Sequence, residues 1–227
     1  MGYGKKIDMD TQVGQTKMMG QPLIVLSDLH GAAKTMFALL ARYPDHRPIL
    51  LGDMVDRGPD SKSIVEWARS NKVLVTKGNH EDLLVDHYMG TGRYEPGLWR
   101  HFNGGNKTIK SWHGRVPKPM VTWMAQLPLY IILPEYPDLL LSHTGHGLGT
   151  TEASSYTEIM DTDALWGRSL DFPHDGYYRI LGHSRVKTAV VTETYARIDT
   201  GAAYPGYGVL SAMLWPSREV VTQPYIG

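Results

Sequence analysis

Three polar clusters follow three apolar runs in the first third of the chain. The clusters are Asp28 with His30, Asp53 with Asp56 and Arg57, and Asn79 with His80 and Glu81. Each preceding run has the length and composition of a buried strand. The carboxyl ends of strands in open α/β sheets are where loops converge and helix N-termini point inward. Three clusters placed there would form a single site.

The side chains in these clusters suit a divalent metal ion. They offer carboxylate and amide oxygens and imidazole nitrogens, a mixture that favours manganese, iron, zinc or a similar ion over calcium. Two more histidines follow later apolar runs, in LLLSHTG and ILGHSR. The inventory is too large for one ion with open positions and about right for two ions that share a carboxylate. Its members are Asp28, His30, Asp53, Asn79, His143 and His183.

Strands and helices alternate in the first half of the chain, which predicts βαβ units around a parallel or mixed sheet. The expected strands are 22–28, 48–53 and 72–78, and the expected helices are 32–43, 61–70 and 81–89. A Gly-rich stretch at 90–114, expected to pass from helix to loop, precedes a short helix at 120–126. The remaining expected strands are 129–133, 138–143, 177–183, 189–195, 196–201, 208–215 and 218–225. We predict an α/β protein with one domain at 21–227 and a polar, mobile tail at 1–20.

Composition narrows the classes of function. The 227 residues suffice for one substantial domain. Lys plus Arg and Asp plus Glu each number 23, so no net field attracts nucleic acid or an anionic membrane. The absence of cysteine excludes disulfides, thiolate zinc sites and cysteine nucleophiles. No apolar run is long enough to span a bilayer, and residues 1–20 lack a signal-peptide core, so we expect a cytoplasmic location.

The motifs SDLHG, GDMVDRG and GNHE occur in this order. They resemble the GDxHG, GDxxDRG and GNHE signatures of the calcineurin-like metallophosphoesterase superfamily. The DRG ending and the complete GNHE are similar to its serine/threonine protein phosphatase branch, as found in bacteriophages and bacteria. The segments SHTG, LWGR, GHS and IDTGAAY extend the resemblance from about Leu23 to Tyr204. It implies a β-sandwich of mixed sheets flanked by helices.

The resemblance also implies a role for each matching residue. Asp28 and His30 would bind one metal, Asp53 would bridge, and the second metal would be completed by Asn79, His143 and His183. His80 would be the general acid and Asp56 the carboxylate that orients it, while the phosphate would be held by Arg57 and Arg168. A hydroxide bridging the two ions would attack phosphorus directly. We expect Mn²⁺, with Fe, Zn, Ni or Co as alternatives.

Three positions depart from the family pattern. Ser27 replaces the first glycine of GDxHG, and Thr144 stands where Ala or Gly is common. Arg185 occupies the place of a second histidine found in other metallophosphoesterase branches. The protein phosphatase branch also lacks that histidine, so this last departure narrows the assignment.

Taken singly, these residues have ordinary structural explanations. A buried Asp at a strand end is commonly a helix cap, and a lone His is more often a core residue than a ligand. The ordered combination favours the metal site. The segment FNGGNKT resembles an NGG-x-x-T element of bacterial relatives, and we read its glycines as a turn. The basic residues around Trp99 and Trp112 are read as a solvated surface with aromatic anchors.

Three functions compete. The first is a phosphatase acting on phosphoserine, phosphothreonine and also phosphotyrosine in proteins or peptides, as a monomer or weak homo-oligomer. The second is a nucleotide hydrolase resembling the symmetrical diadenosine tetraphosphatases, with purine rings stacked on Tyr204, Tyr207, Trp112 or Tyr177. The third is a non-catalytic binding module, which the intact set of chemical residues argues against.

Overall fold

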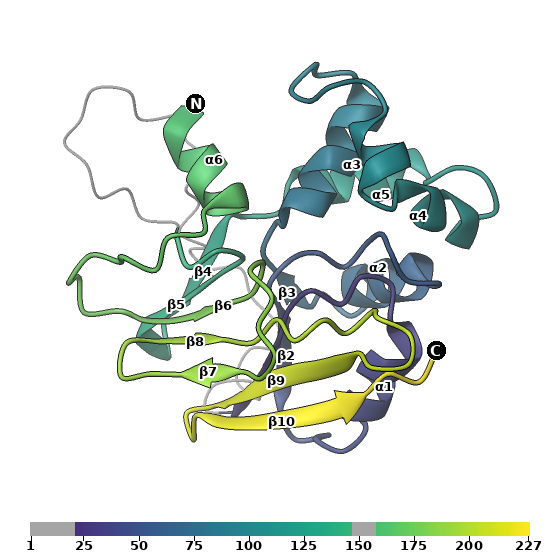
Figure 1. The fold of residues 1–227 in the computed structure, drawn as a ribbon. Coiled ribbons are helices and arrows are strands. Elements are labelled where there is room, and N and C mark those ends of the chain that lie inside the picture. The colour runs from purple at the N-terminus through teal and green to yellow at the C-terminus, as the bar shows by residue number, and fades with distance from the viewer. Residues whose placement is uncertain (1–20, 147–157) are drawn as a thin grey trace.

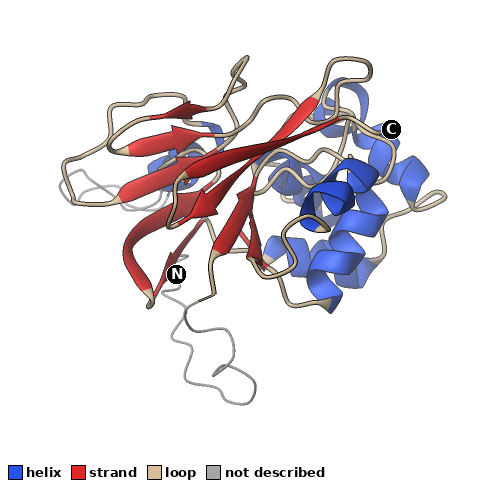
Figure 2. Cartoon of the chain, turned by 90° about the horizontal axis from the view of Figure 1, so that it is seen from below, coloured by secondary structure: helices blue, strands red, loops and turns tan. Residues whose placement is uncertain are grey.

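The computed structural model describes residues 21–146 and 158–227, so the expected tail at 1–20 lies outside the described residues. Within these ranges, two five-stranded mixed sheets pack face to face, with most of the helices on one side (Figure 1 and Figure 2). The arrangement confirms the expected α/β sandwich of mixed sheets flanked by helices. In the described part of the chain, no helix is long and apolar enough to cross a membrane.

The first sheet has the strand order β10-β9-β1-β2-β3. Its parallel part consists of β1 (Leu23–Leu26), β2 (Arg47–Leu50) and β3 (Leu74–Val75), and its antiparallel part of β9 (Val209–Trp215) and β10 (Glu219–Pro224). The register pairs Leu26 with Leu50, and Leu50 with Val75. The three parallel strands therefore end level with one another, so the loops that follow them start at the same edge.

The second sheet has the strand order β4-β5-β6-β8-β7. Its strands are β4 (Tyr130–Leu133), β5 (Tyr136–Ser142), β6 (Tyr178–Leu181), β7 (Val190–Val191) and β8 (Tyr195–Arg197). Strands β5, β6 and β8 are parallel, whereas β4 and β7 pair antiparallel at the two edges. The parallel strands again bring their following loops to a common edge.

Most of the helices lie over the first sheet, and one lies over the second (Figure 1). They are α1 (Ala33–Leu40), α2 (Ser61–Ser70), α3 (Asn79–Met89), the π-helix η2 (Leu98–Phe102), α4 (Gly105–Ser111), α5 (Lys118–Ala125) and α6 (Glu158–Trp166). Figure 1 shows α3, α4 and α5 grouped above the first sheet, with α6 above the second.

The hydrophobic core has two layers because the side chains of a strand alternate between its faces. Ile24 and Leu26 of β1 pack with the helices, whereas Leu23 and Val25 pack against the second sheet. All four are fully buried, so β1 reads as a continuous apolar run, as is typical of a strand covered on both faces.

Two sequence expectations for the last third need correction. Residues 189–195 do not form one strand: the Thr192 hydroxyl accepts from the Thr194 and Tyr195 amides and makes a turn between β7 and β8. A helix, α6, occurs between the expected strands 138–143 and 177–183, where no element was expected. Earlier in the chain, the Gly-rich stretch at 90–114, which was expected to pass from helix to loop, contains η2 and α4.

Candidate metal site and its surroundings

The two sheets bring the predicted residues to one place. Asp28 and His30 follow β1, Asp53 follows β2, and Asn79 and His80 open α3 directly after β3. His143 follows β5 and His183 follows β6. All these side chains are buried except His183, which is half-buried. The first sheet therefore supplies both carboxylates together with the amide and two imidazoles, and the second supplies two further imidazoles.

The backbone at this site is held in an uncommon conformation. Nine described residues other than glycine have positive φ, and six of them belong to the predicted site: Asp28, His30, Asp53, Asp56, Arg57 and His183. Left-handed φ values cost about 1–3 kcal/mol for such residues and persist where surrounding structure enforces them. The concentration of strain here is typical of a functional site.

One group of donor atoms joins the two sheets. His143 Nε2 lies 3.0 Å from Asn79 Oδ1, and His183 Nδ1 lies 3.1 Å from each of these two atoms. His143 Nδ1 lies 2.8 Å from the Leu51 carbonyl oxygen, which makes Nδ1 the protonated nitrogen. His143 Nε2 and Asn79 Oδ1 then both present lone pairs and cannot hydrogen-bond each other. A cation between them would satisfy both, so the donor set fits a metal ion.

Among the described residues, two groups of side chains could hold a metal ion, and Asp53 belongs to both: His30 with Asp53 and His80, and Asp28 with Asp53 and His143. Its Oδ2 lies 3.5 Å from His30 Nε2, and its Oδ1 lies 3.5 Å from His143 Nε2. The two carboxylate oxygens thus face opposite groups, the geometry that a bridging ligand needs. The sequence placed Asp28 and His30 on the same metal, whereas these two groups separate them. His80, expected only as the general acid, lies close enough to His30 and Asp53 to share an ion with them.

Burial shapes the ionisation of the ligands. It raises the pKa of Asp28 to about 6 and the pKa of Asp53 well above its usual range, because charge is costly away from water. For the same reason it lowers the pKa of His143, and that of His183 to about 2. The histidines are therefore neutral and able to bind metal, while positive ions would offset the cost of the buried carboxylates.

These shifts predict how metal binding depends on pH. The pKa of Asp28 is higher in the folded, metal-free protein than in the unfolded chain, so folding favours the protonated carboxyl. The stability that Asp28 contributes is therefore fully present below about pH 4 and is lost as the pH rises through about 6. A bound cation needs the ionised carboxylate, so added Mn²⁺ should raise Tm by several degrees at about pH 8 and much less at about pH 5. Differential scanning fluorimetry with and without Mn²⁺ checks this. An equal rise at both pH values would exclude Asp28 as a ligand.

His80 and Asp56 form a buried pair. His80 Nδ1 lies 2.6 Å from Asp56 Oδ2, and the two side chains are at most 1% exposed. Burial raises the pKa of Asp56 to about 8 and lowers the pKa of His80 well below its usual range. Trp99 and Thr108 also donate to the Asp56 carboxylate, which favours its ionised form and leaves the shared proton on His80 Nδ1. The contact aims His80 Nε2 at the site, where it lies 3.9 Å from Asp53 Oδ2.

The two predicted phosphate arginines lie in different surroundings. Arg57 Nη1 donates to His30 Nε2 at 2.7 Å and Arg57 Nη2 donates to His80 Nε2 at 2.9 Å, so this guanidinium spans the site. Arg168 is exposed and donates to the Ser184 hydroxyl at 3.3 Å, next to His183. The structure therefore brings Arg57 into the cluster and leaves Arg168 at its rim.

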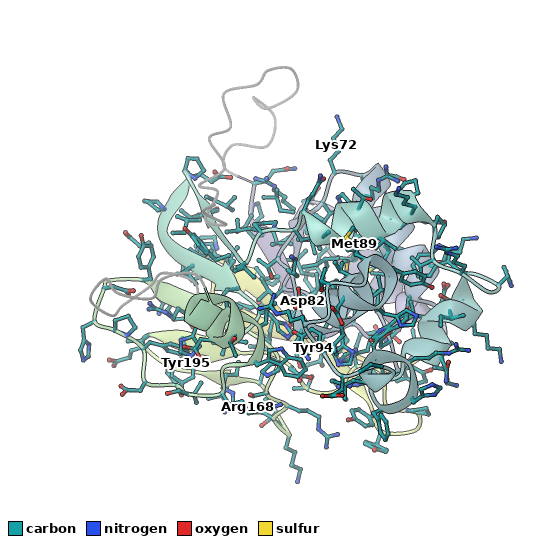
Figure 3. The ribbon with its side chains drawn as sticks, turned by 90° about the horizontal axis from the view of Figure 1, so that it is seen from above. Lys72, Asp82, Met89, Tyr94, Arg168 and Tyr195 are labelled. Atoms are coloured by element: carbon teal, nitrogen blue, oxygen red, sulfur yellow. The ribbon has the colours of Figure 1, made fainter. Side chains whose placement is uncertain are left out.

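A chain of hydrogen bonds ties the rim to α3. Trp166 Nε1 donates to the Tyr94 hydroxyl at 3.0 Å, and that hydroxyl donates to Asp82 at 2.7 Å. Figure 3 shows Tyr94 between Asp82 and the segment that carries Arg168. Thr144, one of the departures from the family pattern, donates from its hydroxyl to the Asp163 and Ala164 carbonyls of α6, and so points away from the metal donors.

Glu81 has a structural part in the site that the sequence did not reveal. Its carboxylate accepts three backbone amides, those of Asp53 at 2.8 Å, Met54 at 2.8 Å and Gly78 at 2.9 Å. The side chain is fully buried and joins the loop after β2 to the start of α3. Its presence in GNHE was the only signal in the sequence.

We predict that Glu81→Gln destabilises the protein, because a carboxamide turns an NH₂ group toward amides that need an acceptor. Loss of buried charge-assisted bonds costs about 1–3 kcal/mol or more. Urea denaturation should show a lower midpoint with an unchanged slope. Glu66→Gln, a half-buried glutamate on α2, is the comparison and should leave the midpoint unchanged. A Glu81→Gln midpoint equal to that of the unmodified protein would contradict this role.

Comparison with known proteins agrees with this fold. The calcineurin-like phosphoesterase family matches residues 21–205, most of the chain, and the protein belongs to this family. Calcineurin-like phosphoesterases use a dinuclear metal site, and the cluster around Asp53 supplies candidate ligands for one. The family resemblance drawn from the sequence motifs is confirmed.

Relatives with two different names cover most of the chain. The asymmetrical bis(5'-nucleosyl)-tetraphosphatase PrpE of Anoxybacillus flavithermus is 25% identical over 89% of this chain and 95% of its own length. Serine/threonine-protein phosphatase 1 of Salmonella typhimurium is 25% identical over 80% of this chain and 87% of its own length. A match to a longer Caenorhabditis elegans protein covers 45% of this chain and 28% of that protein at 29% identity.

Solved structures show the same fold. A crystal structure of a provisionally named diadenosine tetraphosphatase has a TM-score of 0.66 at 18% identity and covers 91% of this chain and 95% of its own. A Saccharomyces cerevisiae protein serine/threonine phosphatase has a TM-score of 0.63 at 14% identity and covers 94% of this chain and 82% of its own. The two likenesses are close in strength, so they identify the architecture and not the substrate.

Proposed function

We propose that this protein is a metal-dependent phosphomonoesterase that removes phosphate from phosphoserine and phosphothreonine in proteins. The observation that carries the proposal is the placement of Asp53 between two groups of metal donors, with Arg57 across them. Two bound divalent ions would polarise the phosphoryl group and supply the nucleophile. The oxygen and imidazole donors suit Mn²⁺, with Fe, Zn, Ni or Co as alternatives.

The protein's own residues would then bind the phosphate and release the product. Arg57 would exchange its imidazole partners for phosphate oxygens, which its planar fork matches. Arg168 would reach the phosphate from the rim. His80, held by Asp56, would donate a proton from Nε2 to the departing oxygen. The exposure of Arg168 and the half-buried position of His183 support an open site that a phosphorylated loop could enter.

A second candidate, a nucleotide hydrolase, is favoured by one surface feature. Tyr204 and Tyr207 stack with ring centroids 5.5 Å apart, and the guanidinium of Arg185 lies 4.6 Å over the Tyr204 ring. Tyr207 is 69% exposed, and Arg185 lies two residues after His183. Aromatic faces of this kind can stack a base, and the relatives named as tetraphosphatases suggest dinucleotide substrates.

Initial rates with Mn²⁺ on p-nitrophenyl phosphate, a phosphoserine peptide and diadenosine tetraphosphate separate these functions. Fast turnover of the peptide with little cleavage of the dinucleotide is the expected result. The reverse preference, lost in Tyr207→Ala without loss of p-nitrophenyl phosphate hydrolysis, would establish the nucleotide hydrolase. No turnover of any substrate by protein with metal bound would contradict both and indicate a binding module.

A further inference from the structure

The segment FNGGNKT contacts the catalytic pair as well as forming a turn. Gly104 has φ of +89° and precedes α4, and Gly105 is the first residue of that helix. A Cβ on Gly104 would lie 2.7 Å from the backbone nitrogen of Arg57, and a Cβ on Gly105 would lie 2.5 Å from the indole ring of Trp99. Larger residues would push α4 away from both neighbours. The two glycines therefore let α4 pack directly against Arg57 and Trp99.

This packing places two donors on Asp56. Trp99 Nε1 donates to Asp56 Oδ1 at 3.0 Å and to Oδ2 at 2.9 Å, and the Thr108 hydroxyl donates to Oδ1 at 2.6 Å. The Thr108 hydroxyl also accepts the Asp56 amide at 2.8 Å, which leaves its proton for the carboxylate. Asp56 and Thr108 are fully buried and Trp99 is 2% exposed, so water does not compete for these bonds.

The bonds fix the direction of the carboxylate. With Trp99 and Thr108 on Oδ1 and Trp99 also on Oδ2, rotation of Asp56 would break at least one buried hydrogen bond. Oδ2 is thereby left facing His80 Nδ1 at 2.6 Å. An indole N–H can only donate, so the arrangement suits a carboxylate that accepts on every side. The orientation of His80 thus depends on Trp99 and Thr108, which lie 43 and 52 positions after Asp56 in the sequence.

We infer that Trp99 and Thr108 are positioning residues that hold Asp56, and through it His80, in the geometry for proton donation to the leaving group. The inference rests on the proposed phosphoester hydrolysis. A water oxygen forms the new bond to phosphorus and releases a proton to solvent, while the P–O bond to the leaving group breaks with its electron pair on the leaving oxygen. Once Arg57 has left His80 Nε2 for the phosphate, that nitrogen takes up a proton from solvent, and this proton passes to the leaving oxygen. Trp99 and Thr108 touch no reacting atom and act only through Asp56.

The leaving group provides the test. Proton donation matters for a poor leaving group such as phenolate or an alkoxide and little for p-nitrophenolate. Trp99→Phe and Thr108→Val should each lower kcat for phenyl phosphate by about 10-fold, which is less than the loss expected when the general acid itself is removed. The same variants should change kcat for p-nitrophenyl phosphate by less than about threefold. Thr108→Ser keeps the hydroxyl and should restore the rate.

The chain offers matched controls. Trp112 is a buried tryptophan whose Nε1 has no hydrogen-bond partner among the described residues, and the buried Thr76 hydroxyl likewise has none there. Trp112→Phe and Thr76→Val remove the same atoms elsewhere and should leave the ratio of the two rates unchanged. Equal losses on both substrates in Trp99→Phe and Thr108→Val, or the same change in ratio in the controls, would overturn the inference.

A measurement on the metal-free protein separates this inference from the proposed function. The proton on His80 Nδ1, in a 2.6 Å bond to Asp56, should give a resolved downfield NMR signal in the unmodified protein. The signal should shift or broaden in Trp99→Phe and Thr108→Val and persist in Trp112→Phe and Thr76→Val. An unaltered signal in the first two variants would overturn the inference, whatever the protein hydrolyses. A protein inert toward every phosphoester would instead refute the proposed function.

Discussion

Replacement of His80 by asparagine should lower kcat for a phosphoserine peptide by roughly 10²–10⁴-fold, the usual contribution of a general acid. The reason is that His80 Nε2 is aimed into the site by the bond from Nδ1 to Asp56, and asparagine cannot donate a proton to an alkoxide. Steady-state kinetics with Mn²⁺, together with elemental analysis of bound metal, check the prediction. His174→Asn, an exposed histidine before β6, is the control and should leave kcat unchanged.

Metal content decides between the two roles open to His80. His80 lies within ligand range of His30 and Asp53, so geometry also allows it to bind an ion. As a general acid it can be replaced with both ions retained. Loss of one ion from His80→Asn would make it a ligand, and a normal kcat would remove it from the mechanism.

The second large effect concerns Asp53. Because its two carboxylate oxygens face different donor groups, Asp53→Asn should weaken both metal ions together. Residues that only hydrogen-bond to metal ligands already change metal affinity by about 10–100-fold. Loss of a ligand shared by both ions should therefore lower the affinity for each by at least about 10²-fold. Isothermal titration with Mn²⁺ measures both affinities. The carboxamide oxygen of this variant can still accept the His80 amide, a bond of 3.0 Å to Asp53 Oδ1 in this structure, so folding should survive.

Asp56→Asn is the comparison for this experiment. Its carboxylate faces Trp99, Thr108 and His80, so the variant should keep both ions while kcat falls. Loss of a single ion from Asp53→Asn, with the second bound at normal affinity, would contradict the bridging role. Loss of both ions from Asp56→Asn would show that the two carboxylates do not have separate tasks.

The sequence was most informative where a polar residue directly follows a buried strand. Asp28, Asp53 and Asn79 are close in space because β1, β2 and β3 are parallel and end in register, a property that strand periodicity and the order of elements predict. His143 and His183 were found in the same way, from apolar runs that proved to be β5 and β6. These positions needed only local patterns and one rule of sheet topology.

The residues that were missed depend on packing between distant segments. Trp99 and Thr108 lie in a Gly-rich stretch with no strand pattern, and only the close approach of α4 brings them to Asp56. Asp199 is a further buried carboxyl, whose pKa burial raises to about 7, and it was noted only as part of IDTGAAY. Helix α6 was missed because acidic residues at 158, 161 and 163 interrupt its apolar pattern.

The central claim, that two ions held around Asp53 hydrolyse phosphoesters, is tested most directly by titrating the metal-free protein with Mn²⁺. Bound metal and the initial rate of p-nitrophenyl phosphate hydrolysis would be measured in the same samples. The proposed function predicts two ions per chain, with the rate rising as the second site fills. A rate that saturates at one ion per chain, or protein that binds two ions and hydrolyses nothing, would contradict it.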